Sequence, residues 1–355
     1  MNPVMRWLQA KLADTQLMML FVSLLAIFVL LSLFGDVLAP LLVAIALAYV
    51  MESGIDFLER CKLPRFIGIG IVGAGALLMV LFALFTLLPL LSGQLGRLIG
   101  QVPEYVKSTR GFLETLQHDY SGWLNPDYLQ QLVATLASKL QGWGADLLSF
   151  SLSSIPGVIT LLVYAVLVPV LVFFLLKDKK LLINWGKGLL PSDHLLLNRV
   201  WKEVDIQIGN YIRGKFIETL IVGVAMWVAY VVLGHEYALL LAVLTGVSVW
   251  VPFIGAAVVT VPVVLLSLFQ WGWSDATLYS LIAYAVIQTL DANVVIPWLF
   301  SEVVNLHPIA IIMAVLIFGS LWGLVGVFVA IPMASLVKSV LTIVAERKDM
   351  ISEAG

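Results

Sequence analysis

One carboxylate lies deep inside a long apolar stretch of the sequence. Asp291 falls within the run 276–300, with Gln288 and Asn293 near it and Pro297 after it. A charge at the centre of a bilayer costs about 2.5 to 3.5 kcal/mol by insertion scales, so an intramembrane carboxylate is by default a functional residue that faces the protein interior. We expect Asp291 to bind a coupling cation or exchange a proton. The alternative for Asp291 and Asn293 is a structural role beside the Pro297 break.

A second polar group opens an earlier apolar run. Lys215 and Glu218 are three residues apart, a spacing that places them on one face of a helix and lets them form an ion pair. Glu218 is a further candidate ligand, whereas Lys215 has the features of an anchor that reaches the membrane surface. His307 begins a later apolar run. Its imidazole can titrate near physiological pH, and the alternative is a capping or interfacial role.

Motifs of hydrolases and nucleotide-driven pumps are absent from the sequence. It contains no His-Glu-x-x-His, no Gly-x-Ser-x-Gly and no Gly-x-x-x-x-Gly-Lys-Ser/Thr, which support zinc chemistry, acyl transfer and phosphate binding. We therefore expect no enzyme activity, no cofactor and no metal site, and any pumping must draw on an ion gradient. The formal net charge of −2 and the lack of a dense basic run argue against nucleic acid as a partner.

Membrane-spanning helices must position these residues. The 355-residue chain is 61% hydrophobic and 12% charged, with a mean hydropathy of +1.03, whereas soluble domains have about 25% charged residues. Lipid is therefore an expected partner. Apolar runs close to the roughly 17 to 25 residues that cross a bilayer core predict an all-α integral membrane protein with about six full transmembrane helices, at 17–34, 37–51, 67–91, 155–176, 216–233 and 276–300.

Two apolar runs in the last third are too long for one span and are broken in the middle. The run 238–269 is interrupted at 250–255 and the run 307–344 at 319–326. Proline and glycine there disfavour a continuous helix. His235 also precedes Trp250 by the same interval as His307 precedes Trp322. We expect two re-entrant hairpins whose tips are formed by Pro252, Phe253, Ile254, Gly255, Gly319, Trp322, Gly323 and Gly326.

The basic residues predict that the two hairpins have opposite orientations. Lys and Arg accumulate in cytoplasmic loops; they flank the second hairpin at Lys338, Arg347 and Lys348 and are absent from 234–237 and 270–275. Helix plus hairpin therefore forms an inverted repeat. Because non-helical backbone cannot face lipid, the two tips should meet near the bilayer midplane, as in secondary-transport sites. The alternative is that both breaks merely relieve packing strain.

The same count of basic residues predicts the remaining organisation, with both termini cytoplasmic and Cys61 in a reducing compartment. Residues 93–154 should form a small extracytoplasmic domain of amphipathic helices. The predicted parts are 1–92 (helices 1–3 of a scaffold), 93–154 (outer domain), 155–177 (helix 4), 178–204 (basic amphipathic cytoplasmic segment), 205–345 (transport module) and 346–355 (cytoplasmic tail).

Six segments resemble the autoinducer-2 exporter (AI-2E) family, in particular its PerM-type permeases. They are LAPLLVAIALAY at 38–49, VFFLLKDK at 172–179, NYIRGK at 210–215, VPFIG at 251–255, NLHP at 305–308 and GLVGVFVAIP at 323–332. The resemblance implies passage of small solutes across the bacterial inner membrane, with some relatives linked to quorum signals and others to sodium or lithium exchange for protons. It also implies a homo-oligomer, a pentameric ring, and an elevator-like movement of the hairpin module.

Together, these patterns predict a secondary transporter for a small solute or signalling molecule. Its pathway would include Asp291, Asn293, Glu218, Gln288 and His307. A monovalent cation/proton antiporter is one alternative. A non-transporting membrane scaffold that acts through residues 93–154 is another.

Overall fold

The computed structural model describes residues 15–119, 155–188, 195–300 and 306–353, with four single positions between 131 and 142. Within these ranges the secondary structure is entirely helical, as the composition predicted. Most of the predicted outer domain, from 120 to 154, lies outside the described residues, as do the N-terminal 14 residues and the last two.

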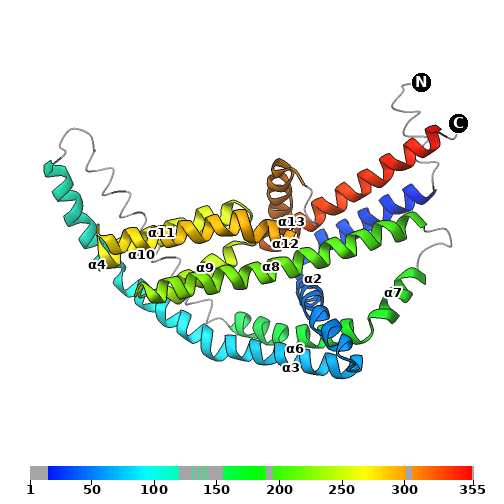
Figure 1. Cartoon of the computed structure of the whole chain (residues 1–355), viewed down its shortest axis with the longest axis horizontal. Coiled ribbons are helices and arrows are strands. Elements are labelled where there is room, and N and C mark those ends of the chain that lie inside the picture. The colour runs from blue at the N-terminus through cyan, green and yellow to red at the C-terminus, as the bar shows by residue number, and fades with distance from the viewer. Residues whose placement is uncertain are drawn as a thin grey trace.

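The N-terminal half consists of long helices. Helix α2 (Thr15–Arg60) is broken at Phe34, whose non-helical φ of −122° and ψ of 17° divide it into two arms at the junction of the predicted spans 17–34 and 37–51. After a short turn, α3 (Arg65–Phe82), the π-helical turn η1 (Ala83–Leu87) and α4 (Leu88–Asp119) follow one another without interruption. Figure 1 shows this rod extending along the molecule and beyond the other helices.

Two further helices complete this half. Helix α6 (Ile155–Lys177) packs against α2 and α3, and the short helix α7 (Lys179–Gly188) follows it directly. Aliphatic and small side chains from the three packed helices form one core, made of Ala44, Met51, Ile55, Ile69, Val168, Val172 and Leu176.

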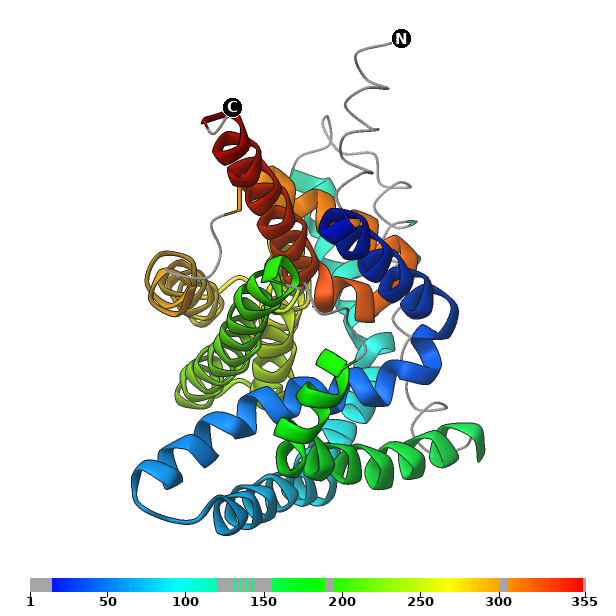
Figure 2. The ribbon, with the colours of Figure 1, turned by 90° about the vertical axis from the view of Figure 1, so that its right-hand side faces the viewer.

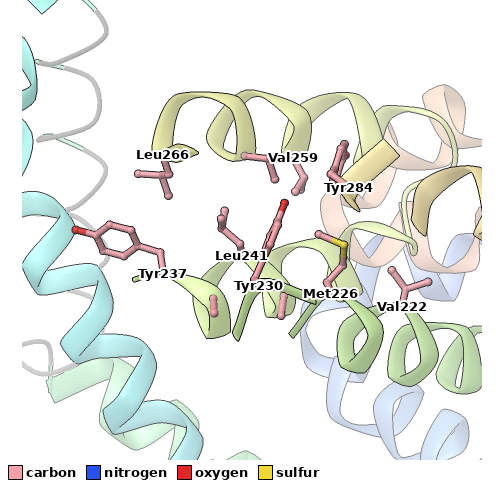
Figure 3. Close-up of a cluster of buried hydrophobic side chains, with 11 residues drawn as sticks. Val222, Met226, Tyr230, Tyr237, Leu241, Val259, Leu266 and Tyr284 are labelled. Carbon is pink, nitrogen blue, oxygen red and sulfur yellow. The ribbon is translucent and has the colours of Figure 1, made fainter. Parts of the chain in front are cut away.

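The C-terminal half is built around α8 (Leu195–Val232). Helices α9 (Ala238–Ser248), α10 (Ile254–Trp271) and α11 (Asp275–Leu290) run alongside it (Figure 1). Their shared core contains large buried side chains, drawn in Figure 3, with Tyr230 and Met226 of α8 at its centre between α9 and α10. The arrangement fixes α9 and α10 against the face of α8 that carries the polar residues described below.

The chain after α11 is bent twice. A π-helical turn, η2 (Asp291–Val295), leads into α12 (Ile296–Phe300), and α13 (Pro308–Glu353) is broken at Trp322 and Gly323, where the φ of Gly323 is 58°. Figure 1 shows the two arms of α13 meeting at this break, and Figures 1 and 2 show its C-terminal arm beside the first arm of α2.

Among the residues whose side chains the structure describes, five helices are long and apolar enough to cross a membrane, and the sequence predicted about six. They are Val37–Arg60, Arg65–Tyr105, Val200–Val232, Ile254–Trp271 and Asp275–Phe300. Of the predicted fourth span, 163–177 belongs to α6, whose full length of 23 residues is enough to cross the bilayer core. The set also includes α10, which was expected to be half of a hairpin. Its 18 residues rise about 27 Å, close to the bilayer core thickness.

Candidate functional site

Lys215 and Glu218 form a buried ion pair on α8. The Lys215 Nζ atom lies 2.8 Å from Glu218 Oε2 and donates a hydrogen bond of 3.0 Å to Oε1. Lys215 is 5% exposed and Glu218 is 1% exposed. The three-residue spacing therefore predicted the pair correctly. The expectation that Lys215 anchors the helix at the membrane surface is wrong, because its ammonium points into the protein.

The same ammonium group is bonded to the end of α9. Lys215 Nζ donates a 2.7 Å hydrogen bond to the carbonyl oxygen of Val249, the residue that follows the last turn of α9. Carbonyl groups at a helix C-terminus lack partners within the helix and carry partial negative charge. Lys215 therefore satisfies one of these carbonyls and ties α8 to the break between α9 and α10.

The ring of Phe300 closes one side of this cluster. Lys215 Nζ lies 5.3 Å from the ring centroid, which is within the range of a cation–π contact. A Cβ atom at Gly214 would lie 2.5 Å from the same ring. A methyl group at position 214 would therefore displace the Phe300 ring from its place beside the lysine.

Asp291 is the second buried carboxylate of the region. It is the first residue of η2 and is 6% exposed, and its Oδ1 atom has no hydrogen-bond partner among the described residues. It lies within electrostatic range of Lys215 and Glu218. A π-helical turn inside an α-helix is often found at functional sites, and here it directly follows α11 and packs on α8.

The other predicted pathway residues do not join this cluster. Gln288 donates to the hydroxyl of Tyr284 (3.0 Å), and Tyr284 donates to the carbonyl of Ala256 (2.8 Å), so Gln288 supports the packing of α11 on α10. Asn293 is exposed and donates to the carbonyl of Thr289 within its own helix. None of these bonds involves Glu218 or Asp291, so the structure groups only those two of the five predicted residues.

His307 has the capping role that the sequence left open. Its side chain is exposed, and its Nδ1 atom accepts a 3.3 Å hydrogen bond from the main-chain N–H of Ile309 in the first turn of α13. The first turn of a helix has donors without internal partners. His307 therefore satisfies one of these donors.

Each helix break contains a glycine that touches the preceding helix. A Cβ atom at Gly255 would lie 1.9 Å from the carbonyl oxygen of Ser248, and one at Gly326 would lie 1.8 Å from that of Phe318. Glycine is required where two backbone segments approach this closely. At both breaks, therefore, the chain folds back onto the end of the helix it has just left.

The remaining predicted tip residues lie in these same breaks. Phe253 adopts the left-handed region (φ 62°) directly before α10, after Pro252. A Cβ atom at Gly319 would lie 3.1 Å from Val327 across the second break. The two arms of α13 pack together through apolar side chains on both sides of this break, namely Ala314, Val315, Phe318, Val327, Ala330 and Ala334.

The two breaks also contact each other. The rings of Trp250, in the first break, and Phe328, just after the second, are stacked with centroids 4.4 Å apart. The Trp322 ring of the second break lies 5.6 Å from that of Phe28 on the first arm of α2. Trp250 of the first break and Trp322 of the second are 72 residues apart in the sequence. The contact between the breaks is therefore a tertiary feature of the fold.

Sequence reasoning missed three hydrogen bonds that join the halves of the molecule. The hydroxyl of Tyr49 on α2 donates to Asp205 of α8. The hydroxyl of Tyr237 donates to Gln101 of α4, and Gln94 of α4 accepts from the main-chain N–H of Leu240 in the first turn of α9. Each side chain is common on helices, so only the tertiary fold identifies these contacts.

The fold and the buried cluster define a multi-pass helical membrane protein with charged groups inside its transmembrane region. The family model described as AI-2E family transporter matches residues 2–346. The chain belongs to the AI-2E transporter family. It is 41% identical to "Putative permease PerM" of Escherichia coli (strain K12) over 338 residues, which cover 95% of this chain and 96% of the relative.

More distant relatives also carry transport names. "Putative transport protein YueF" of Bacillus subtilis (strain 168) is 26% identical over 84% of this chain and 82% of its own length. "Putative transport protein" of Thermotoga maritima is 25% identical over 86% of this chain and 88% of its own length. The family and these names support a role as a transmembrane permease or transport protein, and they name no enzyme activity.

Proposed function

We propose that the chain is a secondary transporter that moves a small solute or signalling molecule across the bacterial inner membrane through the region where the two helix breaks meet. The observation that carries this proposal is the bond from Lys215 to the Val249 carbonyl. It links a buried charged cluster directly to the end of a half-helix. In secondary transporters, charged groups and broken-helix ends of this kind bind substrates and coupling ions.

In this proposal α9–α10 and the two arms of α13 are oppositely oriented re-entrant hairpins of an inverted repeat. Support comes from the glycine that lies against backbone at each break, Gly255 and Gly326, and from the Trp250–Phe328 stacking between the breaks. Non-helical backbone at membrane depth has to line protein or water. In this proposal, protein or an aqueous pathway covers the exposed residues of both breaks, such as Phe253 and Leu321.

The charge balance of the cluster supports coupling to an ion gradient. Lys215 offsets one of the two buried carboxylates, so Glu218 and Asp291 leave an excess negative charge when both are ionised. An unbalanced charge in the membrane is costly. A proton or a monovalent cation bound at Asp291 would remove the excess and alter the pairing of Lys215, which also bonds the Val249 carbonyl. The same argument favours a monovalent cation/proton antiporter as the second candidate.

An elevator-like mechanism would move the part that starts at α8 relative to α2, α4 and α6. Such movement has to break the Tyr49–Asp205 and Tyr237–Gln101 hydrogen bonds. We also propose cytoplasmic termini and a homo-oligomer. The most apolar stretch of the Arg65–Tyr105 helix has no buried residue within one copy of the chain, so this stretch is free to contact lipid or another copy.

The experiment uses purified protein in vesicles that enclose a pH-sensitive dye. A sodium, lithium or potassium gradient is imposed, and proton movement is recorded for the native chain, Asp291→Asn and the matched control Asn293→Ala. Cation-driven proton movement that Asp291→Asn abolishes and Asn293→Ala preserves supports ion coupling at the cluster. Equal movement in all three contradicts it. A cellular function that survives Asp291→Asn but is lost on deletion within 93–154 favours the scaffold alternative.

A further inference from the structure

Helix α7 is a short polar helix with large apolar side chains exposed on it. Leu181 is 69% exposed, Leu182 41% and Trp185 68%. Its 10 residues rise about 15 Å, half of a bilayer core, so the helix cannot span the membrane. An apolar face on a helix with a polar opposite face is typical of helices that lie in the membrane interface.

An ion pair fixes the orientation of this face. Lys179, the first residue of α7, lies 3.1 Å from Glu52 of α2, and Glu52 also pairs with Arg65 of α3 at 2.8 Å. The Lys179 side of α7 therefore faces the protein. At 100° per residue, Leu181 and Trp185 lie about 200° and 240° around the helix from Lys179, so they point away from it.

The position of α7 places its apolar face beside the lipid. The helix begins directly after α6, whose apolar segment Val163–Lys177 ends at its last residue. Figure 1 shows α7 turning away from the axis of α6 at this point. A helix that leaves a membrane helix in this way continues along the membrane surface, where an apolar face can enter the acyl region.

The charges around the start of α7 are complementary to an anionic surface. Exposed cations flank it, namely Arg60, Lys62, Lys177 and Lys180. The acidic side chains at this end are Asp56, Asp178, Glu52 and Glu59, and Arg65 pairs with the last two. Juxtamembrane Lys and Arg residues are attracted to anionic lipid headgroups. We propose that α7 and these four cations form a binding site for anionic phospholipid, with Leu181 and Trp185 inserted in the leaflet.

The test uses the full-length protein in a Cys61→Ser background, since Cys61 is exposed at the same end. Nitroxide labels are attached through Leu181→Cys, Trp185→Cys or Asn184→Cys, the last about 60° to 100° around the helix from the other two. Collision of each label with oxygen and with a water-soluble nickel complex is measured in vesicles of phosphatidylcholine alone and with phosphatidylglycerol added. Elution as a single folded species by size exclusion is checked for each variant.

We expect the labels at 181 and 185 to collide with oxygen severalfold more, relative to nickel, than the label at 184. Phosphatidylglycerol should increase this difference, and Lys177→Gln with Lys180→Gln should remove the increase. Equal water exposure at all three positions would overturn insertion. Insertion to the same extent with and without phosphatidylglycerol would overturn the anionic-lipid site. Spin–spin broadening between labels on different copies would instead assign the face to a second copy of the chain and would also overturn the proposal.

Discussion

The ammonium group of Lys215 bonds the carbonyl oxygen of Val249 at 2.7 Å while it pairs with the carboxylate of Glu218. One side chain thus connects three features: the middle of α8, a buried acid and the end of α9. Any event that changes the charge of this cluster also acts on the break between α9 and α10.

The first prediction concerns removal of one member of this pair. Lys215→Met leaves the Glu218 carboxylate buried without a counter-ion, and breaking a buried pair in this way costs about 3 to 5 kcal/mol. Thermal unfolding in detergent should therefore show a clear loss of stability. The double variant Lys215→Met/Glu218→Met should recover much of the stability, because both charges are gone, yet remain inactive in transport. A stable and active single variant would contradict the role assigned to Lys215.

A second prediction separates the two neighbouring polar residues of η2. Asp291→Asn should leave folding intact and abolish ion-coupled transport, because the amide cannot carry a negative charge. Asn293→Ala should change transport little, since Asn293 is exposed and bonds only its own helix. Vesicle flux assays and unfolding curves measured on both variants test this. Equal loss of transport in the two variants would contradict the separate role assigned to Asp291, because the exposed Asn293 would then matter as much as the buried carboxylate.

The third prediction tests the two helix breaks by substitution of glycine. Gly255→Ala and Gly326→Ala each bring a methyl group within 2 Å of a backbone oxygen, and relief requires the arms to separate. Overpacking typically costs roughly 1 to 3 kcal/mol, and we expect values at or above the upper end. Gly73→Ala is the control because its Cβ would meet nothing within 4 Å. The folded yield and the unfolding temperature of the three variants are compared. Similar values for all three would contradict the close approach of Gly255 and Gly326 to the preceding helix.

A fourth prediction concerns pH and the connector between α8 and α9. Burial lowers the pKa of His235 to about 4, from an ordinary value of 6.5. Its Nδ1 atom accepts a hydrogen bond from the N–H of Tyr237, and the rings of Tyr230 and Trp271 pack against it. The folded protein therefore favours the neutral imidazole. The contribution of His235 to stability is full above pH 6.5 and declines as the pH falls towards 4.

Unfolding temperatures measured from pH 7.5 to pH 4.5 check this prediction. The native chain should lose stability below pH 6.5 relative to His235→Leu, which has no titrating ring at this position. If the two curves run parallel over the whole range, the pKa of His235 is the same in the folded and unfolded protein, which contradicts the prediction.

Several parts of the fold were predictable because they depend on local patterns. Long apolar runs identify spanning helices, and clusters of proline and glycine located both breaks at the correct residues. The break between the first two predicted spans also coincides with the non-helical residue Phe34. The length of α10 was not predicted. It is nearly as long as a full span although its partner α9 has only 11 residues.

The candidate site was predictable only where residues are close in sequence. The spacing of Lys215 and Glu218 predicted their ion pair, and an acid within an apolar run identified Asp291. The bond to the Val249 carbonyl spans 34 residues and involves a main-chain atom, which carries no residue-specific signal. The burial of Lys215 depends on Phe300, 85 positions later, and on the space left by Gly214. Such contacts follow from tertiary packing.

The most direct test of the account is the accessibility of the two breaks from each side of the membrane. Gly255 and Gly323 are poor sites for cysteine, because the first has no space and the second has a φ of 58°. Ile254 and Leu321 are exposed helical positions beside the breaks, so Ile254→Cys and Leu321→Cys are used in a Cys61→Ser background. Each is labelled with an impermeant thiol reagent from either face of oriented vesicles. The account predicts that both react from both faces, in proportions that an imposed ion gradient shifts. Reaction of each from one face only, under every gradient, would contradict transport through the breaks.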